Sequence, residues 1–516
     1  MPYIPLLGRL TPREYTAVLL GTALLLLETV LTRVVALLPT GVIRWFYARS
    51  RELFDALVGP PAPRRPRQRE EREHMRHAER IRRAPDFGAL CELSGVAYEE
   101  HVVRTSDGYL LGLHRIPPRA WSTSAPAGTR TRPSAPVVYL HHGLLMNSEV
   151  WVCLTTPARS LALTLSALGF DVWLGNNRGN KYSRKSVHHP PSSDAFWDYS
   201  IDEFAWADIP ESIAYILRVT GEPSLSYIGF SQGTAQAFAA LSVNHELNRN
   251  VNAFLALAPA MSPAGLAPPL VDALMKASPA LLFLVFGRRA ILSSAHAWQA
   301  VLYPPLFGAL ISASLKYLFK WQCRRISADQ RHAAYAHLYS ACSVKSVVHW
   351  FQIMRTGVFS MYDDETDALA PKRKRAGVTS YAPLRFPTRN ISAPVLLLYG
   401  NEDSLVDIDI MLRELPAHTR ARRLHGYEHL DVLWGADVHV DVIPEVLGTL
   451  KAWCVGPERV DWTIWEKEFG GVGVEEVVLS GKEEDAGLFL RVPGAEEDGE
   501  LGTVSETTSA WGGDDR

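Results

Sequence analysis

The sequence predicts an α/β fold with a mainly parallel central sheet and a large helical insertion between two of its later strands. Short apolar runs alternate with helical stretches from about residue 85 to 455, and this alternation is typical of parallel strands joined by crossover helices. The 516 residues are 47% hydrophobic, which suffices for a large buried core. The predicted insertion is a long and partly apolar stretch at 261–390.

The predicted strands are short and apolar, and turn residues bound them. The first two form a hairpin within 98–116 that turns at Ser106, Asp107 and Gly108. Later strands are expected within residues 136–143, 171–179, 224–233, 251–260, 393–403 and 421–429. Helices at 206–219 and 234–243 lie between some of these strands, so helices are expected to cover both faces of the sheet.

A candidate nucleophile follows the strand expected within 224–233. Residues 228–234 read IGFSQGT, so Ser231 stands between Gly229 and Gly233, after an apolar run and before a helix of small residues. This strand–turn–helix setting is the one that a nucleophile elbow requires. The glycines leave room for a sharp turn, and the helix N-terminus directs N–H groups towards developing negative charge. The pattern predicts Ser231 as a nucleophile.

A serine hydroxyl needs a positioned base, and the base needs an orienting acid. In a chain with a nucleophile elbow the acid and the histidine follow the serine in that order. The loop after the strand at 393–403 offers Glu402, Asp403 and Asp407; Asp403 is the predicted acid and Asp407 the main alternative. His429 follows the last predicted strand and is the predicted base.

The oxyanion hole is predicted from two backbone N–H groups. One belongs to Leu144, which follows the turn at Gly143 in the stretch HHGLLMNS, and the other to Gln232, the residue after the nucleophile. The histidine pairs at 141–142 and 188–189 are interpreted as structural. This chemistry calls for no metal and no organic cofactor.

The N-terminal region is predicted to attach to a membrane or another lipid surface. Residues 15–38 form an apolar run about long enough to cross a bilayer, although Glu28 and Arg33 lie inside it. Residues 40–58 interleave aromatic and aliphatic side chains with arginines, as in an interfacial helix. Residues 15–58 therefore suit a single span, a hydrophobic hairpin or a monotopic anchor about equally; a buried helix pair and a cleaved signal peptide are the alternatives.

Charge and cysteine content limit the other classes of function. The net charge of −2 and a pI near 6.8 give no support for nucleic-acid binding. The five cysteines are scattered, which favours buried free thiols, with a bridge between Cys323 and Cys342 as the alternative. The basic excess at 59–84 suits anionic headgroups on a cytosolic face. The acidic, Gly- and Ser-rich C-terminus is typical of disorder.

These features give a predicted domain organisation. An anchor occupies residues 1–58, a basic linker 59–84, the catalytic core 85–260 and 391–455, a helical cap 261–390, and an acidic, largely disordered extension 456–516. The apolar stretches of the cap are interpreted as a wall and rim for lipid over Ser231. Ordinary core packing and a second membrane span at 301–319 are the alternatives.

Several motifs together resemble the acid lipase family of α/β-hydrolases. They are EEHVVRTSDGYLLGLHRIP, HHGLLMNSEVW, LGNNRGNKYSRKSV, FWDYSIDEFAWADIPESI, GFSQGT and YEHLDVLWG, and they cover most of residues 85–455. The resemblance implies an α/β-hydrolase fold, a triad of Ser231, Asp403 and His429, and oxyanion donors at Leu144 and Gln232. The stretch at 361–383 departs from the family pattern, which in many members has Asp-Tyr-Gly there.

The N-terminus resembles one branch of that family. LLGRLTPREY followed by an apolar segment is similar to the membrane-anchored fungal steryl ester hydrolases of lipid droplets. This resemblance implies hydrolysis of steryl esters to sterol and fatty acid. It also implies a place on the lipid droplet or endoplasmic reticulum membrane, with the catalytic body facing the cytosol. A triacylglycerol lipase with the same triad and an inactive lipid-droplet tether are the alternatives.

Overall fold

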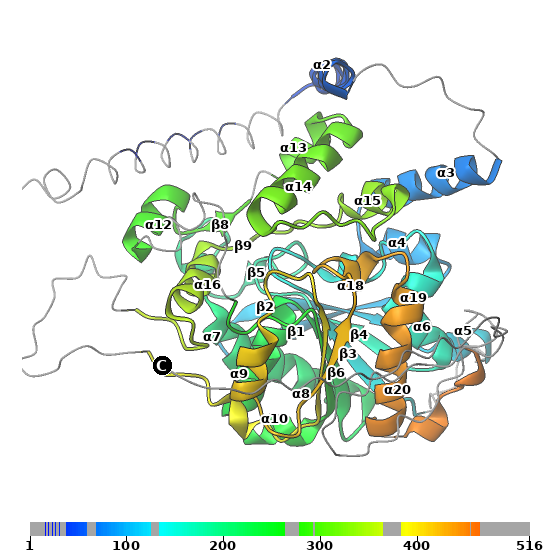
Figure 1. Ribbon diagram of the computed structural model, residues 1–516, viewed down its shortest axis with the longest axis vertical. Coiled ribbons are helices and arrows are strands. Elements are labelled where there is room, and N and C mark those ends of the chain that lie inside the picture. Colours follow the sequence, from blue (N-terminus) through cyan, green and yellow to red (C-terminus); the bar gives the residue numbers. More distant parts are fainter. Residues whose placement is uncertain are drawn as a thin grey trace, which may run out of the picture. The chain divides into compact units, whose positions relative to one another are not determined.

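A nine-stranded sheet forms the centre of the computed structural model (Figure 1). The structure describes residues 38–58, 69–124, 134–263, 278–292, 295–364, 383–454 and 456–464, together with isolated positions between 16 and 30. The strands of this sheet are β1 (Glu99–Arg104), β2 (Tyr109–Ile116), β3 (Val137–His141), β4 (Asp171–Leu174), β5 (Lys185–Ser186), β6 (Leu225–Phe230), β7 (Val251–Leu257), β10 (Val395–Gly400) and β11 (Arg420–Leu424).

The strand order places β6 in the middle of the sheet. The order is β1-β2-β4-β3-β6-β7-β10-β11, with β5 paired to β2. The pairs from β4 to β11 are parallel, whereas β2 pairs antiparallel with β1, β4 and β5. All six residues of β6 are buried, as expected of an apolar strand covered on both faces. The prediction of a mainly parallel sheet is confirmed, and each predicted strand is present.

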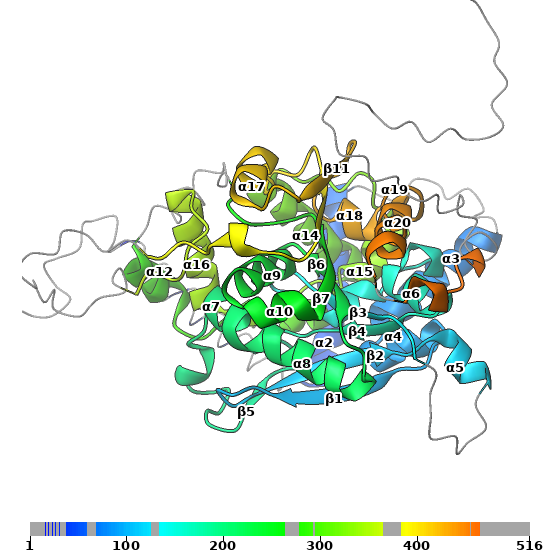
Figure 2. The ribbon, with the colours of Figure 1, turned by 90° about the horizontal axis from the view of Figure 1, so that it is seen from below.

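Helices cover both faces of the sheet (Figure 2). On one face α6 (Leu161–Leu168) and α20 (Ile443–Trp453) pack into one apolar core, and on the other α8 (Ile209–Thr220), α9 (Gln232–Val243) and α10 (His245–Asn250) pack into a second. Smaller helices complete the core: α4 (Phe87–Leu93), α5 (Arg119–Ser124), α7 (Ile201–Glu203), α17 (Ile408–Glu414), α18 (Asp431–Trp434) and α19 (Val438–Asp441). Because side chains are buried on both sides, the sheet is a rigid support for the loops at its carboxyl edge.

The insertion between β7 and β10 is mostly helical where it is described. It contains α12 (Pro279–Phe286), α13 (Ala295–Val301), α14 (Pro304–Phe319), α15 (Ala328–Ala334), α16 (Val344–Thr356), and a small sheet of β8 (Ala290–Ile291) and β9 (Cys342–Ser343). It is tied to the core by Lys345, which pairs with Asp198 at 3.0 Å, and by Tyr362, whose N–H donates to Asp202 at 3.0 Å. The insertion therefore packs on the body at several places.

The helix α2 (Thr40–Val58) lies against the insertion, beside α13 and α14 (Figure 1). Tyr47 and Phe54 hold the Tyr303 ring between them, with centroid distances of 5.5 and 5.8 Å. Other apolar residues of α2 stay exposed, including Trp45 at 54% and Leu57 at 71%. Within the described ranges no helix is both long and apolar enough to cross a bilayer. The predicted apolar segment 15–38 lies almost wholly outside those ranges.

The region predicted as a basic linker contains a docked helix. Residues 69–83 form α3 (Arg69–Arg83), in which Ala78 and Ile81 are fully or almost fully buried. His332 of the insertion pairs with Glu79 at 2.8 Å, and His337 donates to the Ile81 carbonyl at 2.8 Å. This half of the segment therefore belongs to the packed body, because an amphipathic helix buries its apolar stripe when a partner surface is available.

The remaining sequence predictions concern the cysteines and the C-terminus. All five cysteines are buried and free, so the prediction of free thiols is confirmed and the Cys323–Cys342 bridge is absent. Residues 456–464 pack on the core through Trp462, whose ring centroid lies 5.8 Å from that of Phe170. The rest of the predicted acidic extension lies outside the described residues.

Candidate active site

Ser231 stands at the sharp turn between β6 and α9. Its backbone has φ 53° and ψ −120°, a conformation that a residue with a side chain rarely adopts. The Ser231 N–H donates to the Leu257 carbonyl at 3.1 Å, so the neighbouring strand β7 holds the turn. Strained backbone of this kind persists only where the surroundings fix it, and it is common at active sites.

The two predicted glycines of the elbow allow close backbone packing. A Cβ on Gly229 would lie 2.8 Å from the Gly233 carbonyl carbon, and one on Gly233 would lie 2.5 Å from the His141 carbonyl oxygen. Both distances are shorter than any real Cβ contact, so larger residues do not fit without displacing the backbone. The glycines thus bring α9 against β6 and against the end of β3.

The predicted acid and base are in direct contact. His429 Nδ1–H donates to Asp403 Oδ2 at 2.6 Å. Asp403 Oδ1 accepts a second hydrogen bond, from the Leu405 N–H at 3.0 Å. Both side chains are buried, with residue exposures of 2% for His429 and 6% for Asp403. A buried carboxylate in this position fixes the tautomer of the imidazole, so that Nε2 is left to accept a proton.

The alternative acid, Asp407, has a different role. Its side chain accepts from the Ile410 N–H at 3.0 Å and caps the N-terminus of α17. The base lies close to the elbow, because the Phe230 ring centroid is 5.1 Å from the His429 ring centroid. The structure thus brings Asp403 and His429 together and places His429 next to Phe230, the residue before Ser231.

The predicted oxyanion loop lies against the nucleophile. A Cβ on Gly143 would approach Ser231 Cβ to 3.0 Å, so the loop that continues to Leu144 is adjacent to the elbow. The N–H of Gln232 belongs to the first turn of α9, where N–H groups have no acceptor within the helix. The Gln232 side chain is held apart from that N–H, because its Oε1 accepts from Trp350 Nε1 at 2.7 Å.

His142 supports the oxyanion loop. Its Nδ1–H donates to the Gly143 carbonyl at 2.8 Å, and its Nε2 accepts from the Asn177 N–H at 3.1 Å. Burial lowers the pKa of His142 to about 4, so the ring is neutral near pH 7, in agreement with this pattern of one donor and one acceptor. This arrangement gives His142 a structural role in the turn at Gly143.

Several residues that contact the site could not be recognised from the sequence. They come from the insertion or flank the base: Trp321, Ser340, Trp350 and Glu428. The Ser340 N–H donates to the Leu145 carbonyl at 2.6 Å, and the Trp321 ring stacks on His429 at 4.7 Å. Trp321, Ser340 and Trp350 are distant in sequence from the residues they contact, and Glu428 is distant from its partners Gln322 and Cys323, so no local spacing could have revealed these contacts. No group of three potential metal ligands occurs in the part of the chain that is described.

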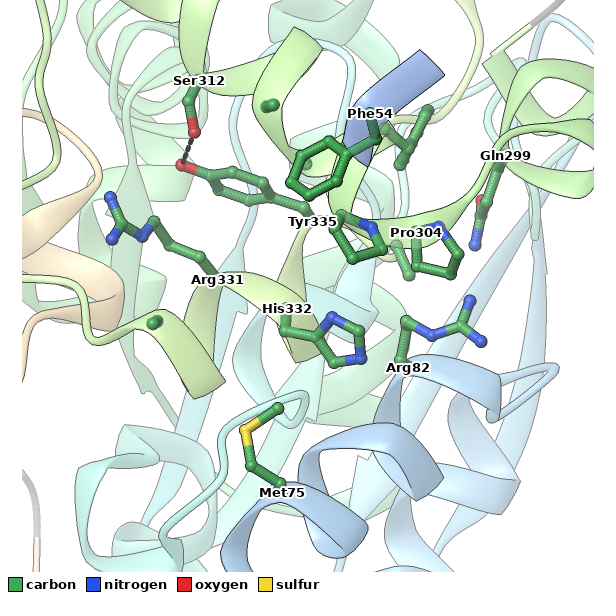
Figure 3. A pocket seen from close by; sticks show the side chains of 15 residues that line it. Phe54, Met75, Arg82, Gln299, Pro304, Ser312, Arg331, His332 and Tyr335 are labelled. Atoms are coloured by element: carbon green, nitrogen blue, oxygen red, sulfur yellow. Dashed lines mark hydrogen bonds between the residues drawn. The ribbon is translucent and has the colours of Figure 1, made fainter. Parts of the chain in front are cut away.

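A separate cavity lies between α2, α3, α14 and α15, with a volume of about 570 Å³ (Figure 3). Phe54 and Tyr335 lie on one side of it and His332 and Arg82 on the other. The described residues that line it do not include any member of the predicted triad. The predicted triad and this cavity are therefore separate features of the described structure.

Comparison with known proteins agrees with the fold. Residues 136–436 match the model of the alpha/beta hydrolase fold family, and residues 87–155 match a partial alpha/beta-hydrolase lipase region. A probable lipase of Schizosaccharomyces pombe is 41% identical over 86% of this chain and 95% of its own length. Rat lysosomal acid lipase/cholesteryl ester hydrolase is 33% identical over 69% of this chain and 88% of its own length. Rat gastric triacylglycerol lipase is 31% identical over 69% of this chain and 89% of its own length.

These similarities define the class as lipases with an α/β-hydrolase fold. The chain belongs to the acid lipase-like α/β-hydrolase family and is a carboxylic ester hydrolase.

Gly233→Ala tests whether close packing at the elbow is needed. The added methyl group would overlap the His141 carbonyl, so we expect a loss of about 1–3 kcal/mol in unfolding free energy. We also expect at least a tenfold fall in kcat/KM on a soluble ester, because small displacements of catalytic groups are costly. Urea unfolding and steady-state kinetics are the measurements.

Gly308→Ala is the matched control. Gly308 lies inside α14, and a Cβ there would be 3.9 Å from its nearest neighbour, the Tyr335 ring. This variant should keep full activity and gain about 0.5–1 kcal/mol of stability. Equal activity in the two variants would show that the elbow tolerates a side chain and would contradict the packing argument.

Proposed function

We propose that this enzyme hydrolyses steryl esters to free sterol and fatty acid through an acyl-enzyme on Ser231. The observation that carries the chemistry is the buried hydrogen bond between His429 and Asp403 at 2.6 Å, beside a serine on a strained strand-to-helix turn. The steryl ester as substrate is supported by the similarity to a cholesteryl ester hydrolase and by the large apolar insertion.

The first half of the reaction forms the acyl-enzyme. His429 Nε2 takes the Ser231 proton while Ser231 Oγ attacks the ester carbonyl carbon. The N–H groups of Leu144 and Gln232 stabilise the oxyanion of the tetrahedral intermediate. His429 then gives its proton to the sterol oxygen, and the C–O bond of the ester breaks. Asp403 keeps the imidazole oriented and stabilises its charged form.

The second half releases the fatty acid. His429 removes a proton from water, whose oxygen attacks the acyl carbon, and the intermediate collapses as His429 returns the proton to Ser231. All transferred protons pass through His429 Nε2. The proposed mechanism therefore requires this nitrogen to face both Ser231 and the substrate. The sequence of steps needs no group beyond the residues named.

Triacylglycerol is the second candidate substrate. Gastric triacylglycerol lipase and the cholesteryl ester hydrolase are nearly equally similar to this chain, at 31% and 33% identity. The triad acts in the same way on either ester, because the acyl half of the substrate is the same. The two substrates differ in the alcohol, a rigid sterol or a flexible glyceride, and an assay must therefore separate them.

We further propose that the enzyme acts on the surface of lipid droplets or the endoplasmic reticulum, with its body in the cytosol. The support is α2, in which Trp45, Phe46 and Leu53 are exposed while Arg44, Arg49 and Arg51 are interleaved with them. An aromatic and aliphatic face with arginines is typical of a helix that lies in a lipid interface. The apolar segment that precedes α2 would add to this attachment.

The substrate proposal is tested with cholesteryl oleate and triolein in matched emulsions. We expect higher kcat/KM on cholesteryl oleate, and no hydrolysis of either by Ser231→Ala, in which kcat falls by about 10³-fold or more. Ser242→Ala, which removes a buried hydroxyl from the same helix α9, should stay active. Preference for triolein would favour the second candidate, and an active Ser231→Ala would contradict the mechanism.

The attachment proposal is tested by flotation with phospholipid-coated droplets. Replacing Trp45, Phe46 and Leu57 by serine removes exposed apolar surface without touching the core, and we expect droplet binding to fall at least tenfold. Val440→Ser, an exposed apolar residue on α19, should bind as the unmodified protein does. Unchanged flotation of the triple variant would rule out α2 as an attachment surface.

A further inference from the structure

The indole ring of Trp321 lies parallel to the imidazole ring of His429. The ring centroids are 4.7 Å apart and the ring planes differ by 6°. Phe319 stacks in turn on Trp321, at 4.3 Å and 15°. Trp321 follows α14 and is buried, with 5% of its surface exposed. An aromatic residue of the insertion therefore covers a face of the predicted catalytic base.

The residue before the base fixes the segment that carries Trp321. The buried carboxylate of Glu428 accepts from the Gln322 N–H at 2.9 and 2.8 Å and from the Cys323 N–H at 2.5 Å. Lys320 and Cys323 have φ values of 63° and 50°, in the left-handed region that side chains disfavour. Such backbone is retained only where surrounding contacts determine it, and Glu428 supplies those contacts next to His429.

Two further ties join the same segment to the catalytic loops. Arg325 donates from Nε to the Gly426 carbonyl at 2.9 Å and from Nη2 to the His425 carbonyl at 3.1 Å. Ser404, the residue after the predicted acid, donates its hydroxyl to the Phe319 carbonyl at 2.7 Å. The segment 319–325 is thus bound both to the loop of the base and to the loop of the acid.

Stacking is the main contact of the indole ring itself. Its Nε1 is buried and has no hydrogen-bond partner among the residues that the structure describes. A buried N–H without a partner is destabilising, because it has lost its hydrogen bonds to water. The ring is therefore held against His429 by its apolar contacts and by the backbone of its segment, at the cost of an unpaired donor.

We propose that Trp321 is a positioning residue for His429. Its face keeps the imidazole in its hydrogen bond with Asp403 and stabilises the imidazolium that forms when His429 takes the Ser231 proton. A cation over an aromatic face within about 6 Å gains about 0.5–2 kcal/mol, and the ring separation lies within that range. This proposal rests on the proposed triad, and it makes the insertion part of the catalytic apparatus.

Charged and titratable groups near His429 come from the loops named above. Asp403 faces Nδ1, Glu428 and Asp431 share the loop of the base, and Cys323 and Arg325 belong to the segment of Trp321. Burial raises the pKa of Asp431 to about 7 and that of Cys323 to about 12. Substitutions of Trp321 leave all these groups in place, so differences among such variants report on the ring.

The test compares Trp321→Leu with Trp321→Phe on p-nitrophenyl butyrate, a soluble ester. Leucine keeps the position apolar but removes the aromatic face, so we expect kcat to fall about 2- to 30-fold with little change in KM. Because the protonated base is no longer stabilised, the acid-side midpoint of kcat/KM should move to lower pH by about 0.4–1.5 units. Trp321→Phe keeps an aromatic ring at this position, so we expect it to retain most of the kcat and most of the acid-side midpoint of the unmodified protein.

Control variants distinguish an effect of the Trp321 ring from a failure of the proposed triad and from a loss of folding. Trp298→Leu, an exposed tryptophan on α13, should leave kcat and the pH profile unchanged. If Trp321→Leu does not fold, Trp321→Met replaces it in the comparison. An unchanged kcat and pH midpoint in Trp321→Leu or Trp321→Met would overturn the proposal. A fall in kcat in Trp321→Phe as large as that in Trp321→Leu would overturn it too. Activity in Ser231→Ala would instead refute the triad on which it rests.

Glu428→Gln tests the backbone clamp by a different measurement. A neutral amide offers one acceptor oxygen in place of a charged carboxylate, so we expect amide hydrogen exchange across 320–326 to accelerate and kcat to fall. Trp321→Phe should leave that exchange slow, because the carboxylate is intact. Exchange in Glu428→Gln as slow as in the unmodified protein would show that Glu428 does not hold the segment.

Discussion

The strained backbone at Ser231 is the constraint on which the rest of the site depends. A non-glycine residue at φ 53° costs of order 1–3 kcal/mol, and the central position of β6 supplies the opposing contacts. Strands β3 and β7 pair with β6 on its two sides, and the Leu257 carbonyl accepts from the Ser231 N–H. The turn is thus held by the central strands of the sheet.

The insertion contacts three of the segments that lie around that turn. Trp350 donates to the side chain of Gln232, Ser340 donates to the carbonyl of Leu145, and Trp321 stacks on His429. A cover that only excluded water would not need these polar contacts. If the proposed mechanism holds, the insertion between β7 and β10 also helps to position the groups that perform the chemistry.

The sequence predicted well the features that have local signals. The apolar strands, the paired glycines beside Ser231, and an acid directly after a strand each depend on residues close together in the chain. Asp403 could be preferred over Asp407 by its place next to β10, and the geometry now shows Asp407 as a helix cap. The docking of α3 and the clamp at Glu428 depend on partners far away in sequence. Periodicity carries no information about which distant surface a helix or a carboxylate meets, so these features required the structure.

The most direct test of the account is the rate and the place of labelling by a fluorophosphonate ester, which reacts with an activated serine. We expect one label per chain, located on Ser231 by mass spectrometry of the peptide. We also expect the labelling rate to fall at least a hundredfold in His429→Gln, because the hydroxyl then lacks its base. A label on another residue, or an unchanged rate in His429→Gln, would contradict the claim that His429 activates Ser231.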